Sequence, residues 1–599
     1  MKTPTISRTN ATIAWVLSGF LFANPLLAAP GPSPSSNSGG TAFPENLRQN
    51  IKHVLIIYLE GRSFDNLYGQ FPRANGIAQA SNKSQAQLTQ KGLEQKFLFQ
   101  PKVIGIPGVP VELDNRFNNK PLPNTNLPYD LQPFVSKNER QPDMLQEFYT
   151  EQYQINDHKN GRFKDDPKNA GGEPMSKFGA WSNNPGVVMG HYNTSDLAEW
   201  RLAKEFVLCD NAFHSAFGDS FLNHMWLIAA RTPVWRWSWP IRSILVKLFE
   251  ANVNGVNGVP LDPKTGSLNY HGLTRDPNLR GFKESNVDQT LEKGSENGNE
   301  NGNAVCWAMN DISPLGFFPF RGPAGGLSTI DPTPPPPTVT VQPQTATFNQ
   351  PNETRLSLQN YDTIGDRLDK AGKNWAWYSQ GWNDAKAGKA NYAFQFTHQP
   401  FAHFTHYALK TSPVPASPDG SKPAIPGTDS DGSKEHLKDL DADFFKDLKD
   451  NKLPAVSFIK PIGQKSKHPG IASLKEGDDW LNDTVTKIRG SDIFKDCVIF
   501  IMYDTNGGQW DHVTPPVIDN WGPGTRVPLI VISPFAKKNF VDHNQYETVS
   551  LLAFIEQLYK LKPLNTRDRD ALPPISAFMG QPDKVPTSNP SSKPTLSPG

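Results

Sequence analysis

The chain has 599 residues, which is enough for one large domain or for several ordinary ones. Lysine and arginine number 60 against 59 aspartate and glutamate residues, so the composition gives no electrostatic reason to expect a nucleic-acid partner. The content of 37% hydrophobic and 20% charged residues is typical of a globular protein, and 55 prolines with 46 glycines indicate long loops.

The N-terminus is typical of an export signal. Basic residues precede the apolar segment 11–29, which ends in small residues suited to cleavage. The alternative is a membrane anchor, but the segment is short for one and is interrupted by Asn24 and Pro25. We therefore predict a signal peptide over 1–29, a flexible leader over 30–45, and an exported protein, periplasmic or secreted, without a stable transmembrane anchor.

Alternating apolar and amphipathic segments indicate the fold class. The continuous apolar segments have the length of strands covered on both faces, and the segments between them have helical periodicity. Strands that alternate with helices predict an α/β fold in which a mostly parallel central sheet lies between helical layers. Strands are predicted at 51–60, 453–461, 497–504 and 527–535, and helices at 195–205, 360–371, 435–450 and 547–561.

Two segments depart from this alternation. A polar and proline-rich insertion occupies about 285–350, and the Pro/Ser-rich tail 580–599 is predicted to be disordered. We therefore predict one folded domain over 46–579.

The three cysteines, Cys209, Cys306 and Cys497, are far apart and form no metal-binding or redox motif. Cys497 lies in an apolar run and is predicted to be a buried thiol. A disulfide between Cys209 and Cys306 stays an open alternative in an exported protein.

Acidic residues follow two of the predicted buried strands. Glu60 comes directly after VLIIYL, and Asp504 comes directly after VIFIMY. In open α/β sheets, ligands bind beyond the carboxyl ends of the strands. Two carboxylates at such an edge indicate a divalent cation between them, because an unpaired buried carboxylate is costly. The alternative is that both acids cap helices or pair with Arg62 and Arg526.

A turn places Ser220 at the predicted start of a helix. Gly218 and Asp219 precede it, and the apolar run FLNHMWLIAA follows. Free backbone amides and the helix dipole favour a phosphate group at such a position. A serine there is, however, more commonly the helix N-cap. The segment also lacks the G-x-S-x-G motif of the α/β-hydrolases.

Histidines beside glycine, proline or aspartate form a third group of candidates. His398, His468 and His512 lie in predicted loops, where an imidazole can donate to phosphoryl oxygens or protonate a leaving group. Any one of them alone is more often a surface residue. No H-E-x-x-H motif indicates zinc.

Several long motifs resemble those of the bacterial phosphoesterases, the family that includes secreted acid phosphatases and phospholipases C. The matching segments run in the same order from about residue 51 to 575, which makes the resemblance far more specific than a lone short pattern. The motifs are HVLIIYLEGRSFDNLYG, DNAFHSAFGDSFLNHMWLIAA, FQFTHQPFAHF, VSFIKPIGQKSKHPG and YDTNGGQWDHVTPP.

The resemblance implies an alkaline-phosphatase-like three-layer α/β sandwich and the hydrolysis of phosphoric esters. It implies that Ser220 is the nucleophile and that Glu60, Ser220 and Asp504 bind one divalent metal ion of unknown identity. The substrate would be a phosphate monoester or a phospholipid-type ester. The further catalytic residues that it implies are Asn223, His398, His468 and His512.

Four polar positions differ from the family pattern. Gly61 replaces an asparagine, Thr505 replaces an acidic residue, and Gln146 and Thr397 each replace a histidine. Fewer anionic ligands should weaken cation binding. A second hypothesis is therefore a catalytically weakened or inactive relative that binds phosphorylated ligands or a partner protein. A carbohydrate or peptide hydrolase is disfavoured, because neither a Ser-His-Asp elbow nor a recognisable carboxylate pair is present.

Overall fold

The computed structural model describes residues 43–88, 115–117, 126–144, 146, 148–157, 173–182, 184–236, 273–274, 304–306, 308–309, 359–386, 393–407, 436–519 and 521–578. The predicted signal peptide, the leader up to residue 42, the predicted disordered tail and most of the insertion at 285–350 lie outside these described residues.

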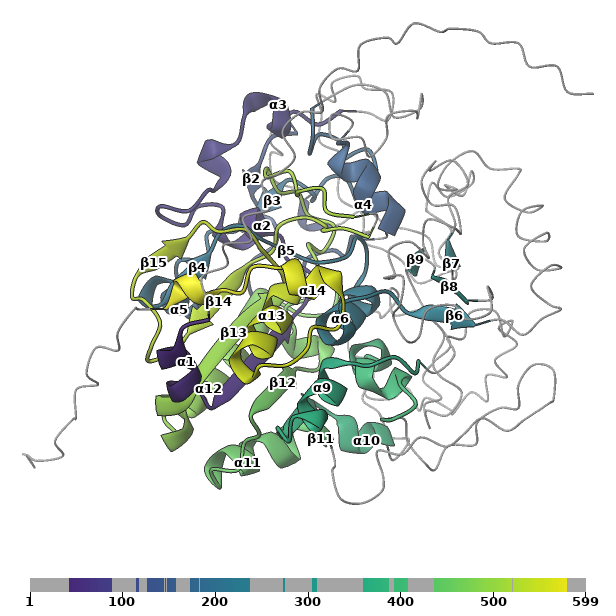
Figure 1. Ribbon diagram of the computed structural model, residues 1–599. Coiled ribbons are helices and arrows are strands. Elements are labelled where there is room, and N and C mark those ends of the chain that lie inside the picture. Colours follow the sequence, from purple (N-terminus) through teal and green to yellow (C-terminus); the bar gives the residue numbers. More distant parts are fainter. Residues whose placement is uncertain are drawn as a thin grey trace, which may run out of the picture. The chain divides into compact units, whose positions relative to one another are not determined.

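An eight-stranded central sheet organises the domain (Figure 1). Its strands are parallel except for β14, which runs antiparallel to both of its neighbours. The prediction of an α/β fold with a mostly parallel sheet is thus confirmed. In spatial order the strands are β11 (Leu437–Asp439), β10 (Trp375–Ser379), β12 (Val456–Lys460), β1 (His53–Leu59), β13 (Cys497–Tyr503), β14 (Leu529–Ile532), β4 (Val207–Cys209) and β15 (Phe540–Asp542).

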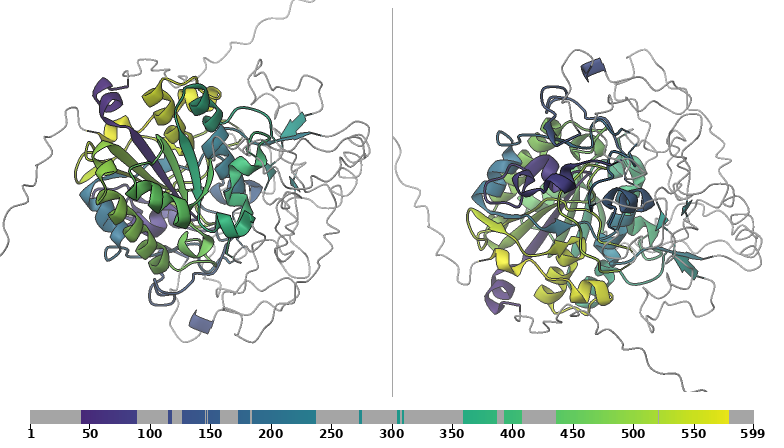
Figure 2. Two further views of the ribbon diagram at one scale, coloured as in Figure 1. Left: turned by 90° about the horizontal axis from the view of Figure 1, so that it is seen from below. Right: turned by 90° about the horizontal axis from the view of Figure 1, so that it is seen from above.

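The two central strands, β1 and β13, are almost wholly apolar because helices cover both faces of the sheet (Figure 2). On one face, Tyr58 of β1 packs edge-on against His224 of α6, and Phe500 of β13 packs against Phe554 of α13. On the other face, the hydroxyl of Tyr503 donates to Glu199 of α5.

The longer helices are α4 (Phe148–Ile155), α5 (Ala198–Glu205), α6 (Ser220–Ala229), α9 (Ile364–Lys370), α12 (Leu474–Arg489) and α13 (Thr548–Tyr559). The short helices are α1 (Glu45–Asn50), α2 (Phe64–Tyr68), α3 (Asn82–Gln85), α10 (Trp382–Lys386), α11 (Phe445–Lys449) and α14 (Thr566–Asp570). Four small two-stranded pairs complete the described strands: β2 (Tyr129–Asp130) with β3 (Gly190–His191), β5 (Ala212–Phe213) with β16 (Tyr546–Glu547), β6 (Val234–Arg236) with β8 (Ala304–Cys306), and β7 (Leu273–Thr274) with β9 (Ala308–Met309).

The segment 435–450 differs from the single helix predicted for it. Leu437–Asp439 is a strand, because it extends the sheet beyond β10 with Trp377 opposite Leu437. The Asp439 side chain then accepts hydrogen bonds from the next turn and so starts the helix that follows. Sheet pairing across the chain has here overridden a local helical pattern.

Two cysteines are buried free thiols. Cys497, at the start of β13, has the state that the sequence predicted, and Cys209 in β4 is also unbridged. Within the described residues, no helix combines the length and the apolar character needed to cross a bilayer.

Candidate active site

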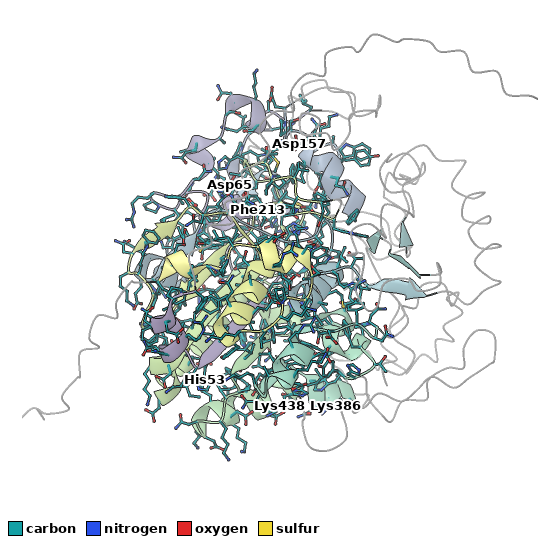
Figure 3. All side chains as sticks on the ribbon, viewed as in Figure 1. His53, Asp65, Asp157, Phe213, Lys386 and Lys438 are labelled. Carbon is teal, nitrogen blue, oxygen red and sulfur yellow. The ribbon has the colours of Figure 1, made fainter. Side chains whose placement is uncertain are left out.

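Parallel pairing brings the two strand-end acids to one edge of the sheet. Leu59 of β1 lies opposite Tyr503 of β13, so Glu60 and Asp504 follow at the same level. Both carboxylates are fully buried. The backbone amide of Gly61 donates to Oδ1 of Asp504 at 2.9 Å, which ties the two strand ends together. In Figure 3, His53 at the start of β1 lies in the lower part of the view, and Asp65, just beyond the end of β1, lies in the upper part.

Ser220 is the first residue of α6 and lies against Glu60. The N-cap is Asp219, whose side chain accepts from the Ser220 amide, so the N-cap interpretation of Ser220 is wrong. The Ser220 hydroxyl instead donates to Oε2 of Glu60 at 2.9 Å. Gly218 has φ +91°, a conformation that glycine adopts readily and that lets the chain turn into the helix here.

Two stacked imidazoles lie beside Glu60. His224 is one turn beyond Ser220 on the same face of α6, and its Nδ1 donates to the Ser220 carbonyl at 2.7 Å. Its Nε2 lies 3.8 Å from Oε1 of Glu60. The ring of His398 stacks on His224 with 4.6 Å between centroids, and its Nδ1 lies 3.4 Å from the same carboxylate oxygen.

A lysine also contacts Glu60. Lys460 is the last residue of β12, and its Nζ donates to the Tyr58 carbonyl at 3.2 Å and pairs with Oε1 of Glu60. Neither Lys460 nor His224 was predicted as a site residue. Their signals were present but weak: a lysine that ends an apolar strand, and a histidine four residues after a candidate nucleophile.

The electrostatics around Asp504 favour a charged Asp504 carboxylate and neutral His224 and His398 imidazoles. Burial would raise the pKa of Asp504, but Lys460, His224 and the Gly61 amide outweigh burial and lower it. Burial lowers the pKa of His224, and it lowers the pKa of His398 well below its ordinary value. A neutral imidazole can act as a metal ligand or as a hydrogen-bond partner of a phosphoryl group.

Unpartnered polar atoms at this edge fit a cation. Oδ2 of Asp504 and Nε2 of His224 are buried and have no hydrogen-bond partner, and the same holds for Oε1 of Glu60 apart from its ion pair. Ligand atoms of Glu60, His224 and His398 all lie within 4.8 Å of one another. Buried polar groups without partners are rare, so these residues are suited to hold a metal ion.

The acids do not pair with the arginines that the sequence offered as partners. Arg62 bonds the Lys467 carbonyl and Gln141, and Arg526 bonds Asp65 and Asp511. Among the described residues, neither arginine contacts Glu60 or Asp504. The alternative interpretation of the two strand-end acids as arginine partners is therefore wrong.

Asn223 holds the turn before Ser220. Its side-chain amide donates to the Ala216 carbonyl at 2.9 Å, and its Oδ1 accepts from the Ala216 amide at 3.0 Å. These bonds use the side chain to fix the turn. Its contact with a phosphoryl oxygen stays a prediction.

His468 belongs to a chain of hydrogen bonds that includes Gln146 and Thr505. Its Nδ1 donates to the Pro469 carbonyl, so its Nε2 accepts from the side-chain amide of Gln146 at 3.4 Å. The Thr505 hydroxyl donates to Oε1 of Gln146 at 2.5 Å. Thr505 directly follows Asp504, so this chain reaches the edge of the site.

His512 lies in a separate buried cluster. Its Nδ1 donates to Asp65 at 2.7 Å, and its Nε2 lies 3.0 Å from the Asn75 side-chain oxygen. Asp65, Asp511 and His512 have the spacing of a metal site. The guanidinium of Arg526 already donates to both carboxylates, however, and balances their charge. A catalytic role for His512 stays a prediction, because its contacts in the described structure are with Asp65 and Asn75 and not with Glu60 or Ser220.

Comparisons with known proteins point to one family. The Phosphoesterase family model matches residues 51–562. The chain is 26% identical over 233 residues to a non-hemolytic phospholipase C of Pseudomonas aeruginosa, covering 33% of this chain and 30% of that protein. It is 28% identical over 229 residues to a non-hemolytic phospholipase C of Burkholderia pseudomallei, covering 34% and 30%. It is 28% identical over 167 residues to non-specific phospholipase C6 of Arabidopsis thaliana, covering 23% and 32%.

The matched part thus spans about a third of the length of these relatives. A solved structure of a protein in the alkaline phosphatase superfamily from Vibrio parahaemolyticus is 11% identical, with a TM-score of 0.20 and coverage of 35% of this chain and 50% of that one. That likeness is too weak to carry an argument. The family model, in contrast, covers most of the residues and confirms the resemblance seen in the motifs: the chain belongs to the Phosphoesterase family.

Proposed function

We propose that the protein is an exported hydrolase of phosphoric esters that uses Ser220 as its nucleophile. The observation that carries this proposal is the hydrogen bond from the Ser220 hydroxyl to Glu60 at the N-terminus of α6. A helix N-terminus favours a phosphate group, and an adjacent carboxylate can accept the hydroxyl proton. The phospholipase C relatives support phosphoric esters as the substrate class, either phosphate monoesters or phospholipids.

The reaction proceeds in two displacements. Oγ of Ser220 bonds to phosphorus as the bond from phosphorus to the leaving oxygen breaks, and the hydroxyl proton passes to Glu60. The leaving oxygen takes a proton from solvent. A water oxygen then bonds to phosphorus as the bond from phosphorus to Oγ of Ser220 breaks, Oγ takes back the proton from Glu60, and the proton lost by the water passes to solvent. Phosphate or a phosphomonoester is released. His398 borders this space and is placed to contact phosphoryl oxygens.

A divalent cation would be held by Glu60, the Ser220 hydroxyl and Asp504, with His224 and His398 beside it. It would lower the pKa of the serine hydroxyl and neutralise phosphoryl charge. In the protein without a bound cation, the ammonium group of Lys460 balances the negative charge of Glu60.

A second candidate function is a non-catalytic member of the family that binds phosphorylated ligands. The pairing of Lys460 with Glu60 favours it, because an ammonium on this carboxylate competes with a metal ion. The neutral Gln146 and Thr505 side chains favour it as well, because they reduce the negative charge near Asp504.

The decisive experiment compares the mature protein with Ser220→Ala on p-nitrophenyl phosphate and p-nitrophenylphosphorylcholine. Both proteins are assayed from acid to neutral pH with Mg²⁺, Mn²⁺, Ca²⁺ or Zn²⁺. We expect hydrolysis by the wild type and a loss of about 1,000-fold or more in the variant. Equal rates under every condition would exclude the hydrolase, and phosphate binding without turnover would establish the binder.

Export is tested separately. The N-terminus of the protein recovered from periplasmic and culture fractions is sequenced. We expect it to begin after Ala28 or Ala29, whereas an intact residue 1 would contradict cleavage.

A further inference from the structure

A fully buried ion pair lies behind the turn that carries the nucleophile. Glu151 belongs to α4, and His214 lies six residues before Ser220. Their side chains are 1% and 0% exposed, and Oε1 of Glu151 lies 2.8 Å from Nε2 of His214. Neither residue takes part in the proposed reaction.

Both ring nitrogens of His214 face oxygen atoms. Nδ1 donates to the Ala216 carbonyl at 2.7 Å, and Nε2 lies 2.8 Å from Oε1 of Glu151 and 3.4 Å from the Thr525 hydroxyl. This arrangement favours an imidazolium on His214 and a carboxylate on Glu151. Burial opposes both charges, yet the attraction between the two groups raises the pKa of His214 and, with backbone amides, lowers that of Glu151.

Glu151 holds two other segments in addition to His214. Its Oε2 accepts from the Gly218 amide at 2.7 Å, two residues before Ser220. Its Oε1 accepts from the amide and the hydroxyl of Thr525, at 2.8 and 3.0 Å. One carboxylate thus fixes both ends of the turn 214–218 and joins it to the chain beyond β13.

The packing around the pair leaves the turn little freedom. A Cβ on Gly218 would lie 2.6 Å from the backbone nitrogen of Phe148 at the start of α4. A Cβ on Gly524 would lie 2.1 Å from Cε1 of His214. Only glycine fits at these two places, so α4, the turn and the Thr525 segment are held in direct contact.

The pair has a cost that stability alone does not explain. Replacing a buried ion pair with apolar residues is often neutral or stabilising, whereas such pairs fix one specific arrangement. The arrangement fixed here is the backbone conformation that begins α6. A misplacement of a reacting atom by about 1 Å costs about 100-fold in rate.

We propose that Glu151 and His214 are positioning residues that set the placement of the Ser220 hydroxyl. This inference rests on the proposed function, in which Ser220 is the nucleophile. Neither side chain touches the Ser220 hydroxyl or Glu60 in the described structure, so both act through the Gly218 amide and the turn.

The test uses Glu151→Gln, which keeps the shape but removes the charge and replaces one acceptor oxygen with a donor. We expect kcat to fall about 100-fold with KM within twofold, because the substrate-binding surface is unchanged. His214→Asn is the second variant. The asparagine amide can still donate to the Ala216 carbonyl, but it cannot reach Glu151 to form the ion pair. The matched control is Glu556→Gln, a buried glutamate on α13 that should retain kcat within twofold.

A readout independent of catalysis keeps the two proposals distinguishable. Hydrogen exchange at the Gly218 amide, measured by NMR, should quicken at least tenfold in both variants and stay unchanged in the Glu556 control. If Ser220→Ala is as active as the wild type, the proposed function fails. The exchange rates then still test whether Glu151 and His214 hold the turn 214–218 in place. If activity depends on Ser220 but the variants keep kcat, or lose it only in step with the control, the inference is overturned. Unchanged Gly218 exchange overturns it as well.

Discussion

Thr505 and Gln146 are joined by a hydrogen bond of 2.5 Å between the threonine hydroxyl and the amide oxygen. Both positions depart from the family pattern, where an acidic residue and a histidine are expected. The two side chains bond each other, and the amide nitrogen of Gln146 also contacts His468. A change at either position should therefore affect the other. Two neutral side chains, bonded to each other, thus stand at the two positions where the motifs lead us to expect an acidic residue and a histidine.

This coupling predicts a non-additive response to restoring the family residues. Thr505→Asp alone places a buried anion beside Asp504 and removes the hydroxyl that donates to Gln146. Gln146→His alone removes the acceptor of Thr505. Each single variant should lose activity, whereas the double variant should recover part of it. A double-mutant cycle on kcat/KM should give a coupling energy of about 1–3 kcal/mol, and an additive cycle would show that the two sites are independent.

Gly61 offers a way to add a ligand to the site. Its φ of +55° is a conformation that asparagine tolerates better than most residues, and its Cβ would lie 3.1 Å from Cδ of Pro469, a contact that requires a small shift. Gly61→Asn should therefore fold and bind divalent cations more tightly than the wild type, as measured by calorimetric titration. Gly61→Ala adds the same Cβ without an oxygen and is the control. Equal affinity in the two variants would show that position 61 does not face the ion.

Lys460 predicts a metal-dependent change in stability. Lys460→Met leaves the Glu60 carboxylate buried without its cation, which should cost about 3–5 kcal/mol in the absence of metal. A divalent cation then supplies the missing charge, so added metal should raise the Tm of the variant more than that of the wild type. Thermal unfolding with metal and with EDTA measures both effects. An equal Tm rise in the two proteins would show that Lys460 and a cation do not compete for Glu60.

The buried Glu151–His214 pair predicts a pH window for stability. The pKa of His214 in the folded protein is raised above its ordinary value of 6.5. The contribution of His214 to the free energy of unfolding is therefore complete below pH 6.5 and declines as the pH rises through the pKa of the folded protein. The pKa of Glu151 in the folded protein is lowered below its ordinary value of 4.5. The contribution of Glu151 to the free energy of unfolding is therefore complete above pH 4.5 and declines as the pH falls through the pKa of the folded protein. The unfolding free-energy difference between the wild type and His214→Asn should therefore be largest between about pH 4.5 and 6.5. Urea denaturation at several pH values measures it, and a difference that grows above pH 6.5 would contradict the assignment.

The fold class and the location of two acids at the carboxyl edge of the sheet could be predicted from the amino-acid sequence alone. Continuous apolar runs such as VLIIYL and VIFIMY are typical of strands covered on both faces, as in a mostly parallel sheet between helices. An acid that directly follows such a run must lie at the carboxyl edge of the sheet. Glu60 and Asp504 were therefore predictable as neighbours, and the order of the motifs was enough to identify the family.

Which other side chains meet at that edge could not be predicted, because it depends on contacts between distant segments of the chain. The contacts of Lys460 and His398 with Glu60, and of Glu151 with His214, join segments between 63 and 400 residues apart in the sequence. Such contacts depend on the register of β1 between β12 and β13 and on the angle at which α6 begins. Local patterns carry no information on either. Apolar periodicity sets which face of an element is buried, whereas close packing of distant elements sets which polar atoms come within bonding distance.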